Sequence, residues 1–533
     1  MSDLITSLRR TRNDHAKEYE WHRFLWDAYT GGGGFEGAVK QPESGYWGPA
    51  AEAYSTGAAS LGLSHDDSYL DRHPREDDRK LQSRRNVAHY WNFVEPVVGL
   101  KLSFLLQRPF TVENLPEEIA EWAEDADGNG HSLEDIVRDV IAVQSAVLGW
   151  TPAIIDLPRA PGELTRAQAR ENGIRPYVTP STPVALLDWH KGRGGRLEWA
   201  KVRTVYSEQA SPLDAPVEIE EITFWYPDRA EVYQIRKVGG AETVAGPEVY
   251  SHPFGEVPVL VSRRKPVPLD PVRGMPWDKQ VAVECRRLFN AISELDEHMR
   301  GQVFAILQVP TSDPTKLGKI TLGVDNAVPI DPDARQSWAY IAPPASVAET
   351  YETRIERTIR EIYRMARVEW DRSTGGVESG EARKKKFAAT NATIVEAARE
   401  LARWQEAVYR LAGRGLGVSE ERLAQIRVIP PTDFDVEELT TKIRNALDAL
   451  SARLGPTASS LIRKRLASAL LPDATSEDRE QIDLEIEGIA KMEETEAQFD
   501  AEISRAQNGS EGLEGGDGDG EDGEEGGDDD GGE

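Results

Sequence analysis

The sequence predicts an α+β fold that is predominantly helical, and three observations lead to this prediction. After Met275 hydrophobic residues recur at helical spacing, above all in two long segments, 278–304 and 347–368. Between 153 and 261 the pattern changes to short segments typical of β-strands. A proline-rich stretch with short β segments separates the two long helices. A chain of 533 residues is long enough for about two to four structural units.

The first part of the chain is predicted to be helical. Residues 13–29 form an aromatic helix, which should end at glycines 31–34 because glycine loses much backbone entropy when it becomes helical. Residues 86–107 form a mostly apolar helix with a kink at Pro96, since proline cannot donate a backbone hydrogen bond. Residues 133–148 form an amphipathic helix.

Five segments of the next region are predicted to form an antiparallel sheet beside these helices. They have the residue pattern of strands, and Pro227-Asp228 marks a hairpin turn between two of them. The segments are 153–157, 197–207, 217–226, 231–238 and 257–262.

The first long helix, 278–304, carries a narrow apolar stripe. Its apolar positions follow one another at steps of three or four residues, so they share one face along the whole helix. Taken alone, such a stripe fits an ordinary helix that faces a core. The positions are Val281, Cys285, Leu288, Ile292, Leu295, Met299 and Val303.

The second long helix, 347–368, has an apolar stripe and a row of arginines. At about 100° per residue, the arginines fall on the face opposite the stripe, and glutamates are interleaved with them. The apolar residues are Tyr351, Ile355, Ile359, Ile362 and Ala366. The arginines are Arg354, Arg357, Arg360, Arg364 and Arg367, and the glutamates are Glu349, Glu352, Glu356 and Glu361.

The arginine row has two interpretations. It fits a solvated face with ion pairs inside one chain, each of which contributes about 0.2–1 kcal/mol. It also fits a contact between subunits, in which arginines of one copy pair with glutamates of the next.

Short β segments and a flexible break lie on either side of the second long helix. Segments 305–309, 319–322 and 339–341 are too short to be stable alone and are expected to pair with another chain. A glycine-containing break at 374–380 precedes a long helix, 381–411, whose first turns are basic.

The composition excludes several classes of protein. A single cysteine, Cys285, excludes a disulfide framework within the chain and fits a reducing compartment. No apolar run reaches the length of a membrane span, and the N-terminus has no signal-peptide pattern. We therefore expect a protein that is made and used in a cytoplasm.

The net charge of −29 is unevenly distributed. Segment 509–533 has twelve acidic residues, eleven glycines and no basic residue, and without those twelve charges the rest of the chain carries −17. This segment can bury too little apolar surface to offset its ordering entropy, so it is predicted to be disordered. Repulsion of DNA, binding of basic partners and simple solubility remain open as its role. The acidic body disfavours wrap-around DNA binding, which needs clustered lysines and arginines.

No pattern of catalytic or metal-binding residues stands out. Residues 125–130 imitate the start of an EF-hand loop, but Ile136 occupies the twelfth position, where a bidentate glutamate is needed. Zinc motifs, a Walker phosphate loop and a Gly-x-Ser-x-Gly elbow do not occur in the sequence. No carboxylate pair is singled out for acid–base chemistry. The sequence therefore predicts no catalytic residue, no metal and no cofactor.

The order of these elements resembles that of the portal proteins of tailed bacteriophages. In that family a wing, a stem helix, a clip, a second stem helix, a channel loop, a long helix and a crown follow one another. The resemblance covers most of the chain and rests on the order of several short motifs. These are Arg85-Asn86-Val87, residues 106–110, Leu148-Gly149-Trp150, Val257-Pro258-Val259, residues 288–293, residues 379–382, and the Leu-Pro-Asp-Ala-Thr run within 455–487.

The resemblance implies a domain organisation and a function. The wing of helices and antiparallel sheet would span 1–274, the first stem helix 275–304, the clip 305–345, the second stem helix 346–368, the channel loop and long wing helix 369–412, the helical crown 413–508 and the disordered tail 509–533. The implied protein is a portal without enzymatic activity, a homo-oligomeric, dodecameric ring at one capsid vertex that packages and ejects double-stranded DNA.

The family also implies partners and site residues. The partners are the terminase large subunit, then head-completion or adaptor proteins, together with the major capsid and scaffolding proteins, in a virion assembled in the host cytoplasm without a membrane. Glu378, Ser379, Arg383, Lys384, Lys385 and Lys386 would border the channel, although a solvated helix turn is the alternative for the basic residues. Arg354, Arg357, Arg360, Arg364, Arg367, Glu352 and Glu356 would join subunits.

Two other functions fit parts of the sequence. A nucleic-acid-processing enzyme with a helical accessory region would need convergent carboxylates or a metal. Another connector or scaffold component of a virus-like particle would be smaller and would lack a clip between paired helices.

Overall fold

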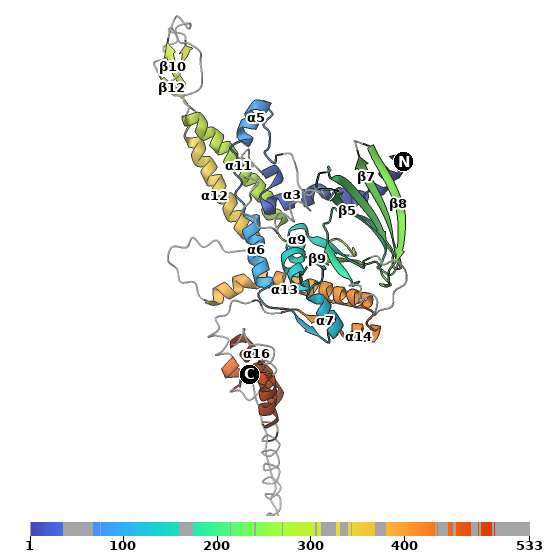
Figure 1. The fold of residues 1–533 in the computed structure, drawn as a ribbon. Helices are drawn as coiled ribbons and strands as arrows, with labels where there is room; N and C mark the ends of the chain where they lie inside the picture. Colours follow the sequence, from blue (N-terminus) through green and yellow to red (C-terminus); the bar gives the residue numbers. More distant parts are fainter. Residues whose placement is uncertain are drawn as a thin grey trace, which may run out of the picture. The chain divides into compact units, whose positions relative to one another are not determined.

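The computed structural model divides the chain into two compact units, Met1–Phe434 and Asp435–Glu533. Helices and β-sheets are combined in the first unit, as the sequence predicts (Figure 1). The structure describes residues 2–35, 68–158, 174–303, 306–310, 327–330, 339–367, 380–431, 434, 446–450, 455–470, 478, 481–492 and 495, except 75, 210, 214, 239–240, 269 and 343.

A layer of helices surrounds the main hydrophobic core of the first unit. The aromatic helix α3 (Tyr19–Thr30) contributes Phe24, Leu25 and Trp26 to this core. It ends at Gly31, whose φ of 74° favours glycine, so the predicted stop at the glycines is confirmed. Short helices complete the layer: α2 (Asn13–Ala16), the 3₁₀ turn η1 (Gly33–Phe35) and α7 (Glu117–Ala123).

The apolar helix predicted at 86–107 is shorter than expected. It is α6 (Val94–Leu105), and Pro96 lies in its first turn, where backbone N–H groups have no helical acceptor. Pro96 therefore starts the helix rather than bending it. The chain before it forms a separate helix, α5 (Asp78–Arg85), which is capped by the Asp77 side chain accepting from the Lys80 backbone N–H at 2.7 Å.

The predicted helix 133–148 is continuous but changes its winding. It consists of α8 (Leu133–Ile136), a π-helical turn η2 (Val137–Ile141) and α9 (Ala142–Leu148). It ends at Gly149, whose φ is 93°. A Cβ atom there would lie 2.5 Å from the Gly274 carbonyl oxygen, so two chain segments pass too closely for any other residue.

The β region forms two antiparallel sheets rather than the predicted single sheet. Predicted strands 153–157 and 257–262 belong to a three-stranded sheet in the order β3-β2-β9. The other predicted strands belong to a five-stranded sheet in the order β4-β5-β6-β7-β8. The strands are β2 (Trp150–Asp156), β3 (Tyr177–Pro180), β4 (Leu186–Lys191), β5 (Leu197–Glu208), β6 (Val217–Trp225), β7 (Arg229–Val238), β8 (Ala241–Ser251) and β9 (Val259–Arg263).

The N-terminal helix α1 (Ser2–Arg9) packs on the five-stranded sheet. Its Ile5 and Leu8 are buried in a small apolar cluster with side chains from three strands. The Lys201 ammonium donates to backbone carbonyls at the end of this helix, with a shortest distance of 2.6 Å. A cation at a helix C-terminus is favourable, so Lys201 helps to fix α1.

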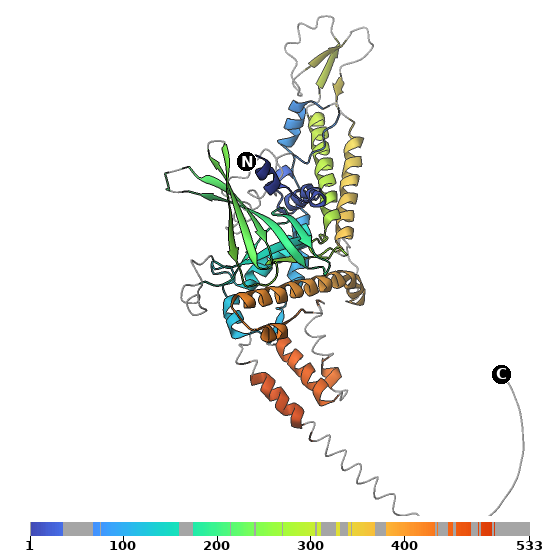
Figure 2. The ribbon, with the colours of Figure 1, turned by 90° about the vertical axis from the view of Figure 1, so that its right-hand side faces the viewer.

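Two long helices form an antiparallel hairpin that extends from the rest of the first unit (Figures 1 and 2). They are α11 (Lys279–Val303) and α12 (Ser346–Ala366), within two residues of the predicted bounds. The free end carries a small sheet in the order β11-β10-β12, formed by β10 (Ile306–Pro310), β11 (Ala327–Ile330) and β12 (Ala339–Ile341).

The strands of this small sheet pair within the chain, whereas the sequence predicted pairing with another chain. β10 runs parallel to β11 and antiparallel to β12. The predicted strand 319–322 lies outside the described residues, and β11 was not predicted.

The predicted helix 381–411 is α13 (Gly380–Gly415). It packs against α6, β9 and a two-stranded sheet of β1 (Thr111–Glu113) and β13 (Arg427–Ile429), and is followed by α14 (Glu420–Gln425). In the second unit, α16 (Pro456–Leu470) is tied to helical residues 481–492 by Lys464, whose Nζ lies 3.0 Å from Glu487 and 3.6 Å from Asp483.

Candidate subunit interface on the helical hairpin

The apolar stripe of α11 extends beyond the core that covers it. Four of its residues, from Val281 to Ile292, are buried, and Ile292 is the most exposed of them at 7%. Further along the same face Met299 is 43% exposed and Val303 is 61% exposed. The stripe is therefore a core stripe in its first half and an open apolar surface near the free end of the hairpin.

The apolar stripe of α12 packs toward α11 and the main core. Ile355, Ile362 and Ala366 are buried, and Tyr351 and Ile359 pack partly buried against the core. The Tyr351 hydroxyl donates to Glu294 Oε2 of α11 at 3.0 Å. Partial burial, and then the neighbouring carboxylate, raise the pKa of Tyr351. This bond fixes the register of the two helices near the middle of the hairpin.

The predicted arginine face of α12 is exposed to solvent. Arg357, Arg360 and Arg364 lie within about 60° of one another around the helix axis, opposite the buried stripe. Arg364 pairs with Glu361 at 2.6 Å, in the same helix. Arg357 and Arg360 have no hydrogen-bond or ion-pair partner in the part of the chain that the structure describes.

The two outer members of the predicted row differ from the rest. Arg354 points toward α11 and lies 3.8 Å from Glu294, so it has a partner within the chain. Arg367 was expected on the helix, but it is the residue after it, with a left-handed φ of 58°. Its guanidinium donates to the Thr393 hydroxyl of α13 at 3.1 Å. The row is shorter than predicted because the helix ends at Ala366.

Three of the four predicted glutamates form a second row beside the arginines. Glu352 and Glu356 are exposed and share one flank of α12 with Glu349. The centre of this acidic strip lies about 80° around the helix axis from the centre of the strip formed by Arg357, Arg360 and Arg364, and the two strips adjoin at Glu356 and Arg360, which are about 40° apart. One helix thus presents an acidic strip and a basic strip on adjoining sides.

The free end of the hairpin exposes further apolar side chains. Tyr340 and Ile341 of β12 are both more than half exposed. His298 Nε2 of α11 lies 3.1 Å from the Pro344 carbonyl oxygen, where the chain returns toward α12. The side chains of β12 therefore have little apolar cover.

The structure describes the backbone of four of the six predicted channel residues. Glu378 and Ser379 lie outside the described residues. Arg383, Lys384, Lys385 and Lys386 lie in the first two turns of α13, whose backbone the structure describes there without the side chains. Their exposure to DNA remains a prediction.

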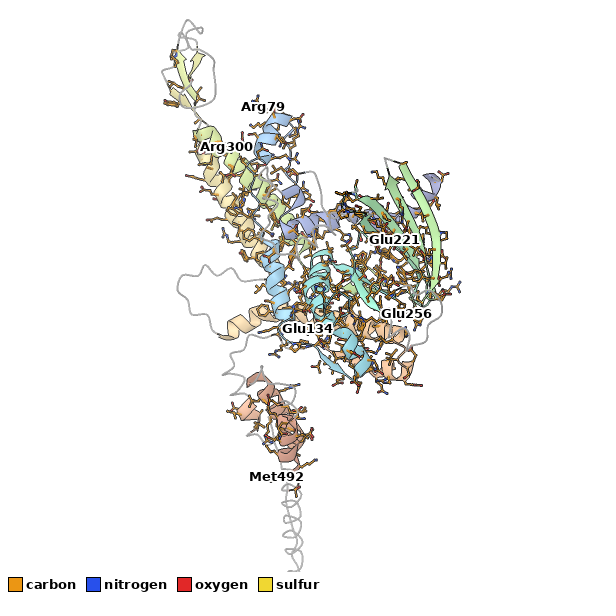
Figure 3. The ribbon with its side chains drawn as sticks, viewed as in Figure 1. Arg79, Glu134, Glu221, Glu256, Arg300 and Met492 are labelled. Atoms are coloured by element: carbon orange, nitrogen blue, oxygen red, sulfur yellow. The ribbon has the colours of Figure 1, made fainter. Side chains whose placement is uncertain are left out.

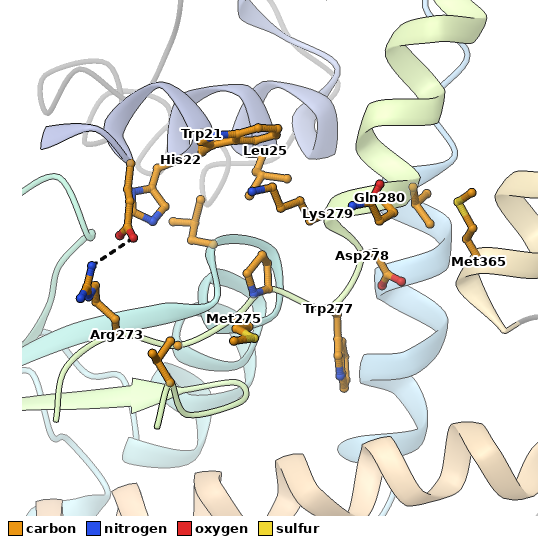
Figure 4. A pocket seen from close by; sticks show the side chains of 16 residues that line it. Trp21, His22, Leu25, Arg273, Met275, Trp277, Asp278, Lys279, Gln280 and Met365 are labelled. Atoms are coloured by element: carbon orange, nitrogen blue, oxygen red, sulfur yellow. Dashed lines mark hydrogen bonds and ion pairs between the residues drawn. The ribbon is translucent and has the colours of Figure 1, made fainter. Parts of the chain in front are cut away.

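A pocket of about 700 Å³ lies where α3 faces the start of α11 (Figure 4). Trp21 and Lys279 meet across it, with the Lys279 Nζ 3.6 Å from the centre of the indole ring. Arg273 Nη1 lies 3.3 Å from Oε1 of Glu18, the residue directly before α3. The sequence does not predict this pocket, because its walls come from segments that are far apart along the chain, such as 18–25 and 273–281.

The acidic loop 125–130 uses its carboxylates within the protein. Asp125 accepts from the Gly130 backbone N–H at 2.8 Å and pairs with Arg175. Asp127 accepts from the backbone N–H groups of Asn129 and His131. Within the described ranges no group of three or more histidine, cysteine or acidic side chains is arranged to hold a metal ion.

The helices that the structure describes include none with the length and apolarity to cross a bilayer.

Comparison with known proteins gives two weak structural likenesses. No protein-family model matches the sequence, and no curated protein matches it. The chain is similar to one in the neck of an empty GTA particle computed with C6 symmetry, at 15% identity and a TM-score of 0.36, over 82% of this chain and 98% of that chain. It is also similar to one in the neck of a native GTA particle computed with C12 symmetry, at 15% identity and a TM-score of 0.35, over 83% and 98%. Likenesses at this level do not identify a function.

Proposed function

We propose that this chain is a portal protein of a phage-like particle, whose copies form a ring around a channel for double-stranded DNA. The ring would occupy one capsid vertex among major capsid and scaffolding proteins. It would dock the terminase large subunit during packaging and head-completion or adaptor proteins afterwards. The proposed role is structural, without catalysis or a cofactor, in a virion assembled in the host cytoplasm.

The outer half of the hairpin carries this proposal. None of residues 294–303 and 346–354 is buried, although both segments are regular helix. Two helices of this length gain most of their stability from apolar burial, and here that burial stops halfway. Side-by-side copies would cover Met299 and Val303 and give the outer half a core of its own.

The charge pattern of α12 supports a ring rather than a symmetric dimer. The acidic strip and the basic strip are centred about 80° apart on adjoining sides of α12, so neighbouring copies that meet this helix from its two sides would face different charges. Contacts between two different surfaces are head-to-tail, and they generate a ring when the rotation between copies closes. The resemblance to portal proteins in the order of motifs supports the same arrangement.

The first measurement that tests the proposal is the mass of the assembly. Mass photometry of the purified full-length chain should show a closed oligomer, and twelve copies of 59.1 kDa would weigh about 710 kDa. Electron microscopy should show rings with a central hole. A monomeric species at micromolar concentration that cleaves DNA with added magnesium would instead support a nucleic-acid-processing enzyme.

Charge reversal tests the proposed contact directly. We expect Arg357→Glu with Arg360→Glu to shift the assembly toward monomers, because glutamates would then face glutamates across each interface. Adding Glu352→Arg and Glu356→Arg to the same chain should restore oligomers. The matched control is Arg193→Glu with Arg196→Glu, an equal charge change at exposed residues of the β4–β5 turn. If the first variant forms unchanged oligomers, the arginine row is a solvated face and not a subunit contact.

A further inference from the structure

A cluster of buried charges lies where the hairpin joins the rest of the first unit. Lys101 of α6 donates to Asp278 Oδ1 at 2.6 Å, and both side chains are almost fully buried. Arg264, directly after β9, is also buried, and its guanidinium carbon lies 3.3 Å from the centre of the Trp277 ring. Asp278 immediately precedes α11, so the cluster sits at the root of the hairpin.

The cluster contains two buried cations and one buried carboxylate. Among the described residues, Asp278 Oδ2 has no hydrogen-bond partner, and neither do Nε and Nη2 of Arg264. Leaving buried charged groups without partners is costly, because the lost hydration is not replaced. One unsatisfied carboxylate oxygen and two unsatisfied guanidinium nitrogens therefore share the same junction.

The pKa shifts of these groups have the signs expected for such a junction. Burial raises the pKa of Asp278, and the neighbouring Lys101 ammonium opposes this shift. Burial lowers the pKa of Arg264 well below its usual range, and Glu396 and Asp278 oppose this shift. Asp278 thus already acts on both cations, although it is hydrogen-bonded to only one.

We propose that Asp278 exchanges between Lys101 and Arg264, and that this exchange tilts the hairpin relative to the rest of the first unit. In the described state the carboxylate is bound to Lys101, and the ring of Trp277 lies against Arg264. In the other state the free oxygen accepts from Arg264, which moves the residue that starts α11. A switch needs two arrangements of similar free energy, and two cations that compete for one carboxylate provide them. The inference concerns a single chain and does not depend on ring formation.

A double-mutant cycle on the full-length chain tests the exchange. Lys101→Met and Arg264→Met remove one cation each and keep an unbranched side chain. We expect each single variant to lower the urea midpoint modestly, because the remaining cation takes over Asp278. In the double variant neither Lys101 nor Arg264 remains to pair with the Asp278 carboxylate. The decrease of its urea midpoint should therefore exceed the sum of the decreases in the two single variants. The matched control, Arg287→Met, removes an exposed arginine that pairs with Glu284 on the same helix, and its effect should be additive with each variant.

A distance measurement tests the tilt. Spin labels at Arg300 and Glu134 report on the hairpin and on the helical layer (Figure 3), with labelled chains diluted into unlabelled ones. Cys285 is buried and burial raises the pKa of its thiol to about 12, so labelling is confined to the introduced cysteines. Lys101→Met and Arg264→Met should shift the distance distribution in opposite directions from the unsubstituted chain. Additive losses in the cycle, or identical distributions in the three proteins, would each overturn the proposal.

Discussion

Charged side chains contribute to this protein in ways that depend on their surroundings. Arg357 and Arg360 are exposed, so each adds little to the stability of one chain, and a partner across an interface would give them a role. Lys101 and Asp278 are buried as a pair, so their charges act on the stability of the single chain. The effect of substituting the exposed arginines should therefore be measured on oligomer formation, and the effect of substituting the buried pair on the free energy of unfolding.

His22 should make the protein sensitive to acid. Burial is the main cause that lowers its pKa from 6.5 to about 3 in the folded chain, and the nearby His15 adds to the shift. Below pH 6.5 the unfolded chain binds a proton at this imidazole and the folded chain does not. Stability is then lost as the pH falls toward 3, by about 1.4 kcal/mol per pH unit.

The check is urea unfolding of the protein and of His22→Leu at pH 7.5, 6 and 5. The urea midpoint should fall more steeply with acid in the unsubstituted protein than in the variant. Between pH 7.5 and pH 5 the unsubstituted protein should lose about 2 kcal/mol more of its free energy of unfolding than the variant. Parallel pH dependences in the two proteins would mean that the His22 imidazole is protonated in the folded state.

Individual residues were predicted from the sequence only where neighbours along the chain determine their environment. The arginine row was predicted because helical periodicity alone places its residues on one face, and the error at Arg367 reflects a helix end set by contact with α13. The Lys101–Asp278 pair was not predicted, because the two residues are 177 positions apart and no local pattern connects them.

At the scale of elements, the stripe of α11 has two parts with different expected effects. Ile292→Ala removes buried methyl groups, so it should lower the free energy of unfolding by about 2–4 kcal/mol. Met299→Asp together with Val303→Asp changes exposed positions and should alter the unfolding of one chain by less than about 0.5 kcal/mol.

Oligomer formation, in contrast to unfolding, should be sensitive to the substitutions at Met299 and Val303. The two aspartates place charge on the surface that neighbouring copies would cover, so oligomers should be lost although the chain stays folded. Leu213→Asp, at a side chain that is 96% exposed on the β5–β6 connection, is the control. If mass photometry shows that the variant with both aspartates forms full oligomers, the outer half of the hairpin is not part of the subunit interface.

Long helices were predicted more accurately than sheets, and the reason is physical. The periodicity of α11 and α12 is repeated over many turns, so their bounds were correct within two residues. Strand β8 was missed because most of its side chains are exposed and its sequence lacks alternation. The separation into two sheets depends on pairing between distant strands such as β2 and β9, which the sequence of either strand does not specify.

For the molecule as a whole, charge and composition distinguish the acidic segment 509–533 from the rest of the sequence. Segment 509–533 contains one leucine and no other large apolar residue, so it has almost nothing to bury. Deleting it changes the net charge of each copy from −29 to −17. We expect the truncated chain to have an unchanged urea midpoint and to form the same oligomer.

The same deletion should change how assembly depends on salt. Twelve negative charges on each copy repel one another when copies are brought together, and salt screens this repulsion over about 8–10 Å. The full-length chain should therefore assemble at lower concentration as salt is added, whereas the truncated chain should assemble well in low salt and respond less. Mass photometry over a salt series measures both. Loss of oligomers after truncation would assign the tail a direct contact in the assembly, and equal salt dependence would locate the repulsion in the folded part of the chain.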